Sequence, residues 1–287
     1  MLKIHRKRQE LINHLLQLKA ENLSLGFVPT MGALHRGHVS LVEEAHKHCD
    51  HVLASIFVNP NQFNKAEDLA NYPVDLDGDL HQLELAGCHD VFVPNVEEIY
   101  PIGHVVPHYP LLGLETRLEG EKRPGHFQGV AAVLQQLFEL VMPHKAFFGE
   151  KDFQQVAVVK WLVQYLNLNI DVVVCSTVRE SGGLAMSSRN RRLSEVGKER
   201  ANIIYQCLQV LSQHLKNGDV RPSLEAIKQF LNAQSHMQID YLEVANELDF
   251  ELAKTSEDIQ NGNWRLFAAV YVEGVRLIDN LPISQTP

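Results

Sequence analysis

The sequence contains little cysteine and no long apolar segment, and each absence excludes a class of protein. Its four cysteines, at positions 49, 88, 175 and 207, are far apart and form no C-x-x-C pair. This spacing excludes a thiolate zinc knuckle and suits a reducing compartment. No apolar run reaches the ~18 residues of a membrane-spanning helix. The basic N-terminus has apolar residues at helical spacing, unlike a signal peptide. We therefore expect a cytoplasmic protein.

An excess of positive charge is also absent. The chain has 26 Lys and Arg residues against 35 Asp and Glu, which gives a formal charge of −9 at pH 7. Because nucleic acids and anionic membranes attract a positive field, we expect neither as a partner. The length of 287 residues exceeds the ~100–200 residues typical of one domain, so two domains are expected.

Short apolar runs alternate with amphipathic stretches up to residue 176. The apolar runs, which predict buried strands, lie at 23–28, 51–58, 89–94, 145–149 and 170–175. Helical periodicity fills the intervals between them. Strand–helix alternation of this kind predicts an α/β domain over 1–176, a Rossmann-like parallel sheet with helices on both faces. Ligands in such sheets bind beyond the carboxyl ends of the strands.

The pattern changes after residue 176. Two helical stretches, 194–218 and 221–234, precede a strand at 239–246 and a hairpin over 263–280 that turns at Glu273-Gly274. Helices followed by antiparallel strands predict a smaller α+β domain over 177–287.

Two histidines stand where the first strand meets the first helix. The turn Pro29-Thr30-Met31-Gly32 follows the strand, and H-x-G-H places His35 and His38 at the helix start. Residues three apart share a helix face, and a helix N-terminus attracts phosphate. Two imidazole donors there can stabilise charge on a phosphoryl group. Two incidental surface histidines are the alternative.

Two further segments have the same chemistry. Lys151 directly follows the fourth predicted strand and can neutralise phosphate. In "GGLAMSSRN", Ser187, Ser188 and Arg189 combine hydroxyls with a guanidinium, which suits a polyphosphate. A solvated lysine and a mobile basic loop are the alternatives.

These motifs resemble a known family. The chain has, in order, "PTMGALHRGHVSLV", "SIFVNPNQF", "RPGHFQGV", "FFGEKDFQQ", "TVRE", "GLAMSSRN" and "DYLEV". The blocks are similar to those of the pantothenate synthetase (pantoate–β-alanine ligase) family, within the H-x-G-H nucleotidylyltransferase superfamily, and cover nearly the whole chain.

The resemblance implies an AMP-forming ligase of pantothenate and coenzyme A biosynthesis. ATP and (R)-pantoate would give pantoyl adenylate and pyrophosphate, and β-alanine would then displace AMP to give pantothenate. It also implies Mg²⁺ with ATP, a homodimer, an ATP- and pantoate-binding domain over 1–176 and a lid domain over 177–287.

The resemblance also implies site residues. The catalytic residues would be His38 (the acid), His35 and Lys151. ATP would be bound by Met31, Gly32, Ala33, Leu34, His35, Arg36, Gly37, His38, Gly149, Glu150, Lys151, Asp152, Val178, Met186, Ser187, Ser188 and Arg189. Pantoate and β-alanine would be bound by Gln62, Gln155, Asn59, Tyr72 and Arg123. Asp79 and Gln82 would bind the metal. The chain departs from the family's usual residues at Val74, Gly78, Ser176 and Gly182.

Two other classes compete with this interpretation: another adenylyl-transferring enzyme, such as a tRNA synthetase or a mononucleotide adenylyltransferase, and a non-catalytic nucleotide-binding protein. The acidic charge opposes the synthetase, and the presence of His38, Lys151 and Arg189 opposes the non-catalytic protein. The segment "HKHCDH" (46–51) also contains metal-ligand residue types. We expect its side chains to diverge, because it spans a helix end and a strand start.

Overall fold

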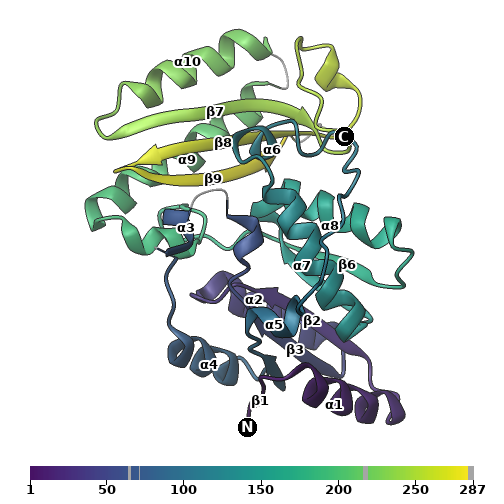
Figure 1. The fold of residues 1–287 in the computed structure, drawn as a ribbon. Coiled ribbons are helices and arrows are strands. Elements are labelled where there is room, and N and C mark those ends of the chain that lie inside the picture. The colour runs from purple at the N-terminus through teal and green to yellow at the C-terminus, as the bar shows by residue number, and fades with distance from the viewer. Residues whose placement is uncertain (64–65, 71, 216–218, 284–287) are drawn as a thin grey trace. The chain divides into compact units, whose positions relative to one another are not determined.

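The computed structural model describes residues 1–63, 66–70, 72–215 and 219–283. The chain divides into two compact units (Figure 1). Unit 1 comprises Met1–Glu150 and Gln154–Ser176, and unit 2 comprises Lys151–Phe153 and Thr177–Pro287. Lys151–Phe153, which directly follow Gly149 and Glu150, therefore group with unit 2.

Unit 1 is built on a six-stranded sheet in which every pairing is parallel, in the order β1-β4-β3-β2-β5-β6. The strands are β1 (Lys3–His5), β2 (Leu25–Thr30), β3 (His51–Ile56), β4 (Asp90–Phe92), β5 (Lys145–Gly149) and β6 (Asp171–Cys175). The predicted Rossmann-like sheet is thus confirmed, although the prediction omitted β1. The strands β2 and β5 are neighbours in the sheet. From β2 the chain continues to β3 on one side, and from β5 it continues to β6 on the other side, so the direction of strand addition reverses between β2 and β5. The carboxyl ends of β2 and β5 are therefore the expected ligand position.

Helices cover this sheet because its strands are apolar on both faces. The helices between β1 and β6 are α1 (Arg8–Ala20), α2 (Arg36–His48), α3 (Ala66–Ala70), α4 (Leu76–Leu85), α5 (Val96–Ile99), α6 (Glu119–Lys122), α7 (His126–Val141) and α8 (Phe153–Tyr165), with 3₁₀ turns η1 (Pro60–Gln62) and η2 (Glu150–Asp152). Leu41, Val42 and Ala45 of α2 pack with Val28 and Phe147 of the sheet in one buried cluster. The helix that begins at the H-x-G-H motif is thereby fixed against the strands.

Unit 2 contains a three-stranded antiparallel sheet in the order β7-β8-β9. Its elements are η3 (Ser188–Arg192), α9 (Glu195–His214), α10 (Val220–Asn232), β7 (Met237–Asn246), η4 (Asp258–Gln260), β8 (Trp264–Val272) and β9 (Val275–Pro282). The predicted hairpin is confirmed: it turns at Glu273 and Gly274, with φ of 49° and 76°, as a two-residue type I′ turn requires. Buried residues of α9, α10 and the sheet form one core.

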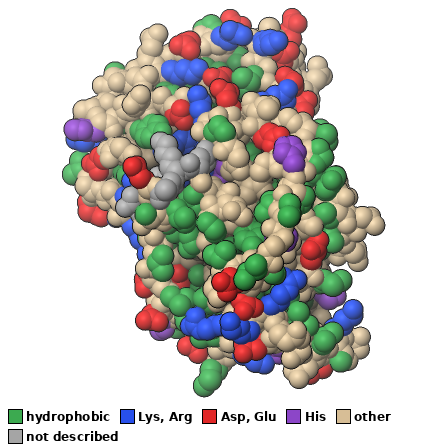
Figure 2. Space-filling model, viewed as in Figure 1, with side chains coloured by type: hydrophobic (Ala, Val, Ile, Leu, Met, Phe, Trp, Pro, Cys, Tyr) green, Lys and Arg blue, Asp and Glu red, His purple; other side chains and the backbone are tan. Residues whose placement is uncertain are grey.

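The surface matches the mixed composition. Figure 2 shows acidic and basic side chains interspersed over the described residues of the face drawn. Among the helices that the structure describes, none is long and apolar enough to cross a membrane.

Candidate active site

The two histidines of H-x-G-H cap α2 with their own side chains. His35 is the N-cap residue, and its Nδ1 accepts the N–H of Gly37 at 3.1 Å. The Nδ1 of His38 accepts the N–H of His35 at 3.3 Å, and the two ring centroids are 4.1 Å apart. Because each Nδ1 acts as an acceptor, a neutral ring has its proton on Nε2. Both half-buried imidazoles are therefore donors at the carboxyl end of β2.

The loop before this cap is held by α4. Asp79 is 1% exposed, and its Oδ2 and Oδ1 accept the N–H groups of Ala33 at 2.8 Å and Leu34 at 2.6 Å. Gln82 donates to the carbonyl of Leu34 at 3.2 Å. Gly32 and Ala33 have φ of 80° and 51°, a left-handed conformation that is costly for alanine. The α4 side chains therefore stabilise a strained loop, a role that the sequence did not suggest.

A second set of polar residues follows β3. Asn59 is 1% exposed and donates to the Gly129 carbonyl at 3.0 Å and to Oε1 of Gln62 at 3.2 Å. Gln62 donates in turn to Sδ of Met31 at 2.6 Å. The structure thus brings together three predicted residues: Met31, Asn59 and Gln62. Tyr100, which sequence reasoning missed and no motif indicated, donates its hydroxyl to Oδ1 of Asn59 at 3.1 Å.

Gly129 allows the close approach of the two elements that carry this second set, α7 and η1. A Cβ at Gly129 would lie 2.2 Å from the carbonyl oxygen of Asn61, so only glycine lets α7 approach η1 this closely. His126, the first residue of α7, contacts the Gln62 carbonyl through Nδ1 at 3.0 Å. Both residues lie in the "RPGHFQGV" block, which is the signal that could have identified them.

The remaining predicted residues of unit 1 are more scattered. Gln155 is half-buried on the first turn of α8, and Arg123 caps α6 and lies 3.9 Å from Glu119. Tyr72 packs edge-on against Phe63, and Arg36 is exposed and pairs with Glu43. Gly149 and Glu150 lie where β5 ends. These residues thus come from separate elements of unit 1.

Unit 2 gathers its own predicted residues around one cavity. Lys151, Ser187 and Arg189 line it together with Arg276 and Asp279. The Lys151 side chain is 15% exposed, its Nζ lies 4.0 Å from Oδ2 of Asp152, and its carbonyl accepts from Nδ2 of Asn280 at 2.8 Å. Three cations against one carboxylate make the described lining net positive, which suits an anionic group.

The "GGLAMSSRN" segment is held by backbone and side-chain hydrogen bonds. Met186 donates its N–H to the Val178 carbonyl at 2.9 Å. Ser187 caps η3, where its Oγ accepts the N–H of Arg189 at 3.3 Å, and Ser188 is the first residue of that turn. Asn190, which sequence reasoning missed, donates to the Ala185 carbonyl at 3.1 Å. The serines and Arg189 therefore belong to one ordered turn.

The four departures from the family's usual residues differ in their surroundings. Val74 is 75% exposed, and Ser176 is exposed after β6. A Cβ at Gly78 would lie 2.4 Å from Oδ2 of Asp75, the side chain that caps α4. A Cβ at Gly182 would lie 2.0 Å from Nδ2 of Asn202. Both glycines thus make room for a polar partner.

Comparison with known proteins decides the family. The family model described as pantoate-beta-alanine ligase matches residues 3–282, from β1 through β9. The chain belongs to the pantoate–β-alanine ligase family.

Individual ligases agree over almost their whole length. Pantothenate synthetase of Cytophaga hutchinsonii is 46% identical over 279 residues, which cover 96% of this chain and 97% of the relative. A Thermus thermophilus pantothenate synthetase structure superposes with a TM-score of 0.88 at 40% identity, covering 98% of this chain and 99% of that one. The Francisella tularensis pantoate-beta-alanine ligase, described as complexed with beta-gamma ATP and beta-alanine, gives a TM-score of 0.84 at 34% identity with both chains covered completely. Both units of the chain are thus shared with the ligases.

Proposed function

We propose that the chain condenses (R)-pantoate with β-alanine at the expense of ATP, through a pantoyl-adenylate intermediate, and releases AMP and pyrophosphate. The observation that supports this most directly is the paired cap of His35 and His38, whose Nε2 donors lie at the carboxyl end of β2. Membership of the ligase family and the ATP and β-alanine named for the Francisella protein give the substrates.

In the first step a pantoate carboxylate oxygen attacks the α-phosphorus of ATP, and the bond to pyrophosphate breaks. Negative charge develops on the departing group, so hydrogen-bond donors that are already oriented lower the barrier. We assign this role to the Nε2–H groups of His35 and His38, with His38 as the acid. The N-terminus of α2 adds a positive dipole end. The β-alanine amine then attacks the acyl carbon and AMP leaves.

The cations of unit 2 would hold the triphosphate. Lys151 and Arg189 line one cavity with Ser187, and Ser188 lies on the same 3₁₀ turn. We assign these four residues and Arg36 to the phosphates, and the Gly32–Gly37 segment to ATP with them. Met31, Gly149, Glu150, Asp152, Val178 and Met186 are assigned to the rest of the nucleotide. Closure of unit 2 as a lid follows as part of this proposal.

Pantoate is assigned to the polar residues after β3. The amide of Gln62 donates to a thioether, which is a weak acceptor, so a pantoate carboxylate or hydroxyl oxygen is a better partner. Asn59 holds Gln62 in place through its own amide. Gln155, Tyr72 and Arg123 are assigned to pantoate and β-alanine with them.

Magnesium is proposed only as the companion of ATP, because it binds through substrate phosphates and one or two carboxylates. Both oxygens of Asp79 accept backbone N–H groups, and Gln82 donates to a carbonyl. Because the loop already engages both carboxylate oxygens of Asp79, that side chain is a poor direct ligand, and the ion is assigned to the phosphates. A homodimer and a cytoplasmic location are proposed with the family.

The test is product analysis with (R)-pantoate, β-alanine and Mg²⁺-ATP. We expect AMP and pyrophosphate in equal amounts, and exchange of labelled pyrophosphate into ATP when pantoate is present without β-alanine. ADP and inorganic phosphate as products would indicate an acyl-phosphate mechanism. Pyrophosphate release that depends on tRNA or on a mononucleotide, and not on pantoate, would assign the chain to the competing adenylyl-transferring class.

A further inference from the structure

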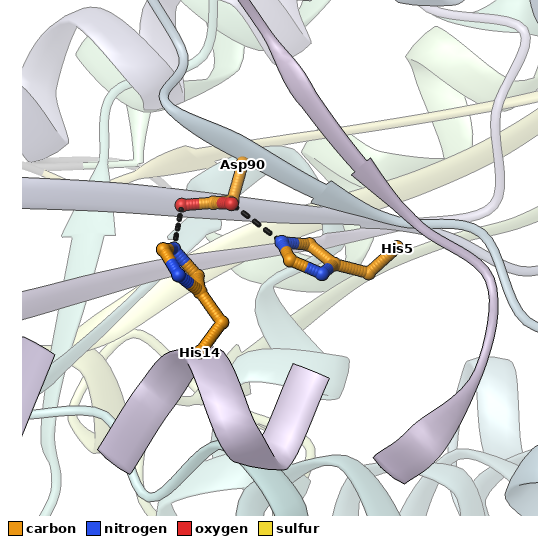
Figure 3. Close-up of side chains that lie close together, drawn as sticks. All are labelled: His5, His14 and Asp90. Carbon is orange, nitrogen blue, oxygen red and sulfur yellow. Dashed lines mark hydrogen bonds and ion pairs between the residues drawn. The ribbon is translucent and has the colours of Figure 1, made fainter. Parts of the chain in front are cut away.

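A buried carboxylate lies among imidazoles where β3 and β4 begin. Asp90 is the first residue of β4, and its side chain is 3% exposed. Three histidines from three other elements converge on it: His5 of β1, His14 of α1 and His51 of β3. Nε2 of His5 lies 2.5 Å from Oδ1, and Nε2 of His14 lies 2.9 Å from Oδ2 (Figure 3). Nothing in the proposed reaction uses this cluster.

Stacking fixes the rings of this cluster in place. The rings of His5 and His14 stack with centroids 5.0 Å apart. His51 stacks on His89 at 4.3 Å, and Nδ1 of His89 accepts the N–H of Val52 at 3.0 Å. Preorganised imidazoles with Nε2 turned inward lose little freedom when they bind a common ion.

The charge of the cluster also suits a cation. An aspartate carboxylate is ordinarily ionised at neutral pH, and Asp90 has both oxygens within hydrogen-bond distance of imidazole nitrogens. Within residues 1–63, 66–70, 72–215 and 219–283, His5, His14 and Asp90 are the one group of three such side chains whose ligand atoms all lie within 4.8 Å of one another.

We propose that Asp90, His5 and His14 bind a divalent first-row transition metal, with Zn²⁺ as the best fit. Imidazole nitrogens with one carboxylate oxygen form a ligand set that zinc accepts in tetrahedral sites. Without metal, the Nε2–H groups donate to Asp90. With metal, each ring proton moves from Nε2 to Nδ1, and the ion bonds to the Nε2 atoms and to the Asp90 carboxylate.

Lys3 opposes this exchange and makes it testable. Its Nζ donates to Nδ1 of His14 at 3.0 Å, so the neutral His14 ring has its proton on Nε2. When a metal takes Nε2, the ring proton moves to Nδ1 and Lys3 must turn away. Lys3 is exposed and can do so. Removal of Lys3 is therefore expected to strengthen metal binding.

Of the histidines in residues 46–51, one contacts this cluster. His51 contacts Asp90, whereas His48 pairs with Glu44 on α2. The three proposed ligands come from distant positions, since Asp90 lies 85 residues from His5 and 76 from His14. No local spacing in the sequence indicates such a site.

Zinc titration of the metal-stripped full-length chain by calorimetry tests the proposal, with Mg²⁺ alone as the comparison ion. We expect one Zn²⁺ per chain and no heat from Mg²⁺ at this site, since magnesium prefers oxygen ligands. Co²⁺ should give the visible absorption of a low-coordinate complex. A chain that binds no zinc one-to-one overturns the proposal.

Two variants locate the binding. His14→Gln keeps an amide donor toward Asp90 but removes the imidazole, and should lower zinc affinity more than about 100-fold, beyond the loss from outer-shell changes. His48→Gln, the matched control on α2, should bind zinc unchanged. Zinc affinity that survives His14→Gln overturns the site. If that variant does not fold, zinc affinity is measured in Lys3→Ala, because Lys3 is exposed. Tighter zinc binding in this variant supports the site, and unchanged or weaker binding overturns it.

Discussion

The same sheet holds two groups of histidines that use opposite ring nitrogens. At the end of β2, His35 and His38 accept backbone N–H groups through Nδ1, and this directs their Nε2 donors away from the cap. At the start of β3 and β4, His5 and His14 turn Nε2 onto the buried carboxylate of Asp90. The two groups thus differ in the ring nitrogen that the fold engages: Nδ1 at the cap of α2, and Nε2 at the carboxylate of Asp90.

The largest expected effect breaks the first group. His38→Asn retains an oxygen that can accept the N–H of His35 in place of Nδ1, but it removes the Nε2 donor. We expect adenylate formation, measured by pyrophosphate exchange, to fall by roughly 10²–10³, the scale of losing one preorganised donor. His48→Asn, at the far end of α2, is the matched control and should keep the wild-type rate.

A near-normal rate in folded His38→Asn would remove His38 from the chemistry. It would also show that the cap, which the variant retains, is all that this histidine contributes.

The next largest effect compares a glutamine that the backbone holds with one that contacts a weak acceptor. The amide of Gln154 makes hydrogen bonds to the backbone of Leu114, Arg117 and Glu119, whereas Gln62 donates to a thioether. Gln62→Ala should raise the KM for pantoate by roughly 10–150-fold, because a lost hydrogen bond to a charged group costs about 1.5–3 kcal/mol.

Gln154→Ala is the informative contrast to Gln62→Ala. It should lower thermal stability while the KM for pantoate stays near that of the wild type. Equal losses of apparent ATP and pantoate affinity in Gln62→Ala would contradict the assignment of Gln62 to pantoate.

Much of the fold could be predicted, because hydrophobic periodicity is a local property. The strand at 145–149 was predicted with the bounds that β5 has, and the hairpin turn at Glu273-Gly274 was placed correctly. The strand β1 was missed because three residues are too short for a periodic signal. Its partner β4 supplies the pairing, and that contact spans more than 80 positions.

The local geometry was predictable where the residues belong to one motif, as in H-x-G-H, whose two ring centroids lie 4.1 Å apart. It was not predictable where the function of a side chain depends on a distant backbone. Asp79 is an example, because its two carboxylate oxygens accept N–H groups that lie 46 and 45 positions away. The positive φ of Ala33, which orients those N–H groups, cannot be recognised from the residue types of the loop.

Asp79→Asn tests how the loop is held, and its expected effect is of intermediate size. One carboxylate oxygen becomes an amide N–H₂ that faces a backbone N–H, so a buried donor loses its acceptor at a cost of about 1–3 kcal/mol. We expect the free energy of unfolding, measured by urea denaturation, to fall by that amount, and the rate of pyrophosphate exchange to fall with it because His35 follows the loop. Asp77→Asn, at an exposed position of α4, should change neither quantity.

The smallest expected effect separates the two roles that Asp79 and Gln82 can have. Gln82 makes one neutral hydrogen bond to the Leu34 carbonyl, so Gln82→Ala should cost about 0.5–1.5 kcal/mol of unfolding free energy and slow pyrophosphate exchange only severalfold. Asp79 and Gln82 bind the N–H and the carbonyl of the same residue, so a double-mutant cycle should give a coupling energy of about 0.5 kcal/mol or more. Both defects should be indifferent to Mg²⁺ concentration if the two side chains act by holding the loop. If millimolar Mg²⁺ restored the exchange rate of either variant, the predicted metal role would be favoured instead, because a weakened metal site is refilled by mass action whereas a displaced loop is not.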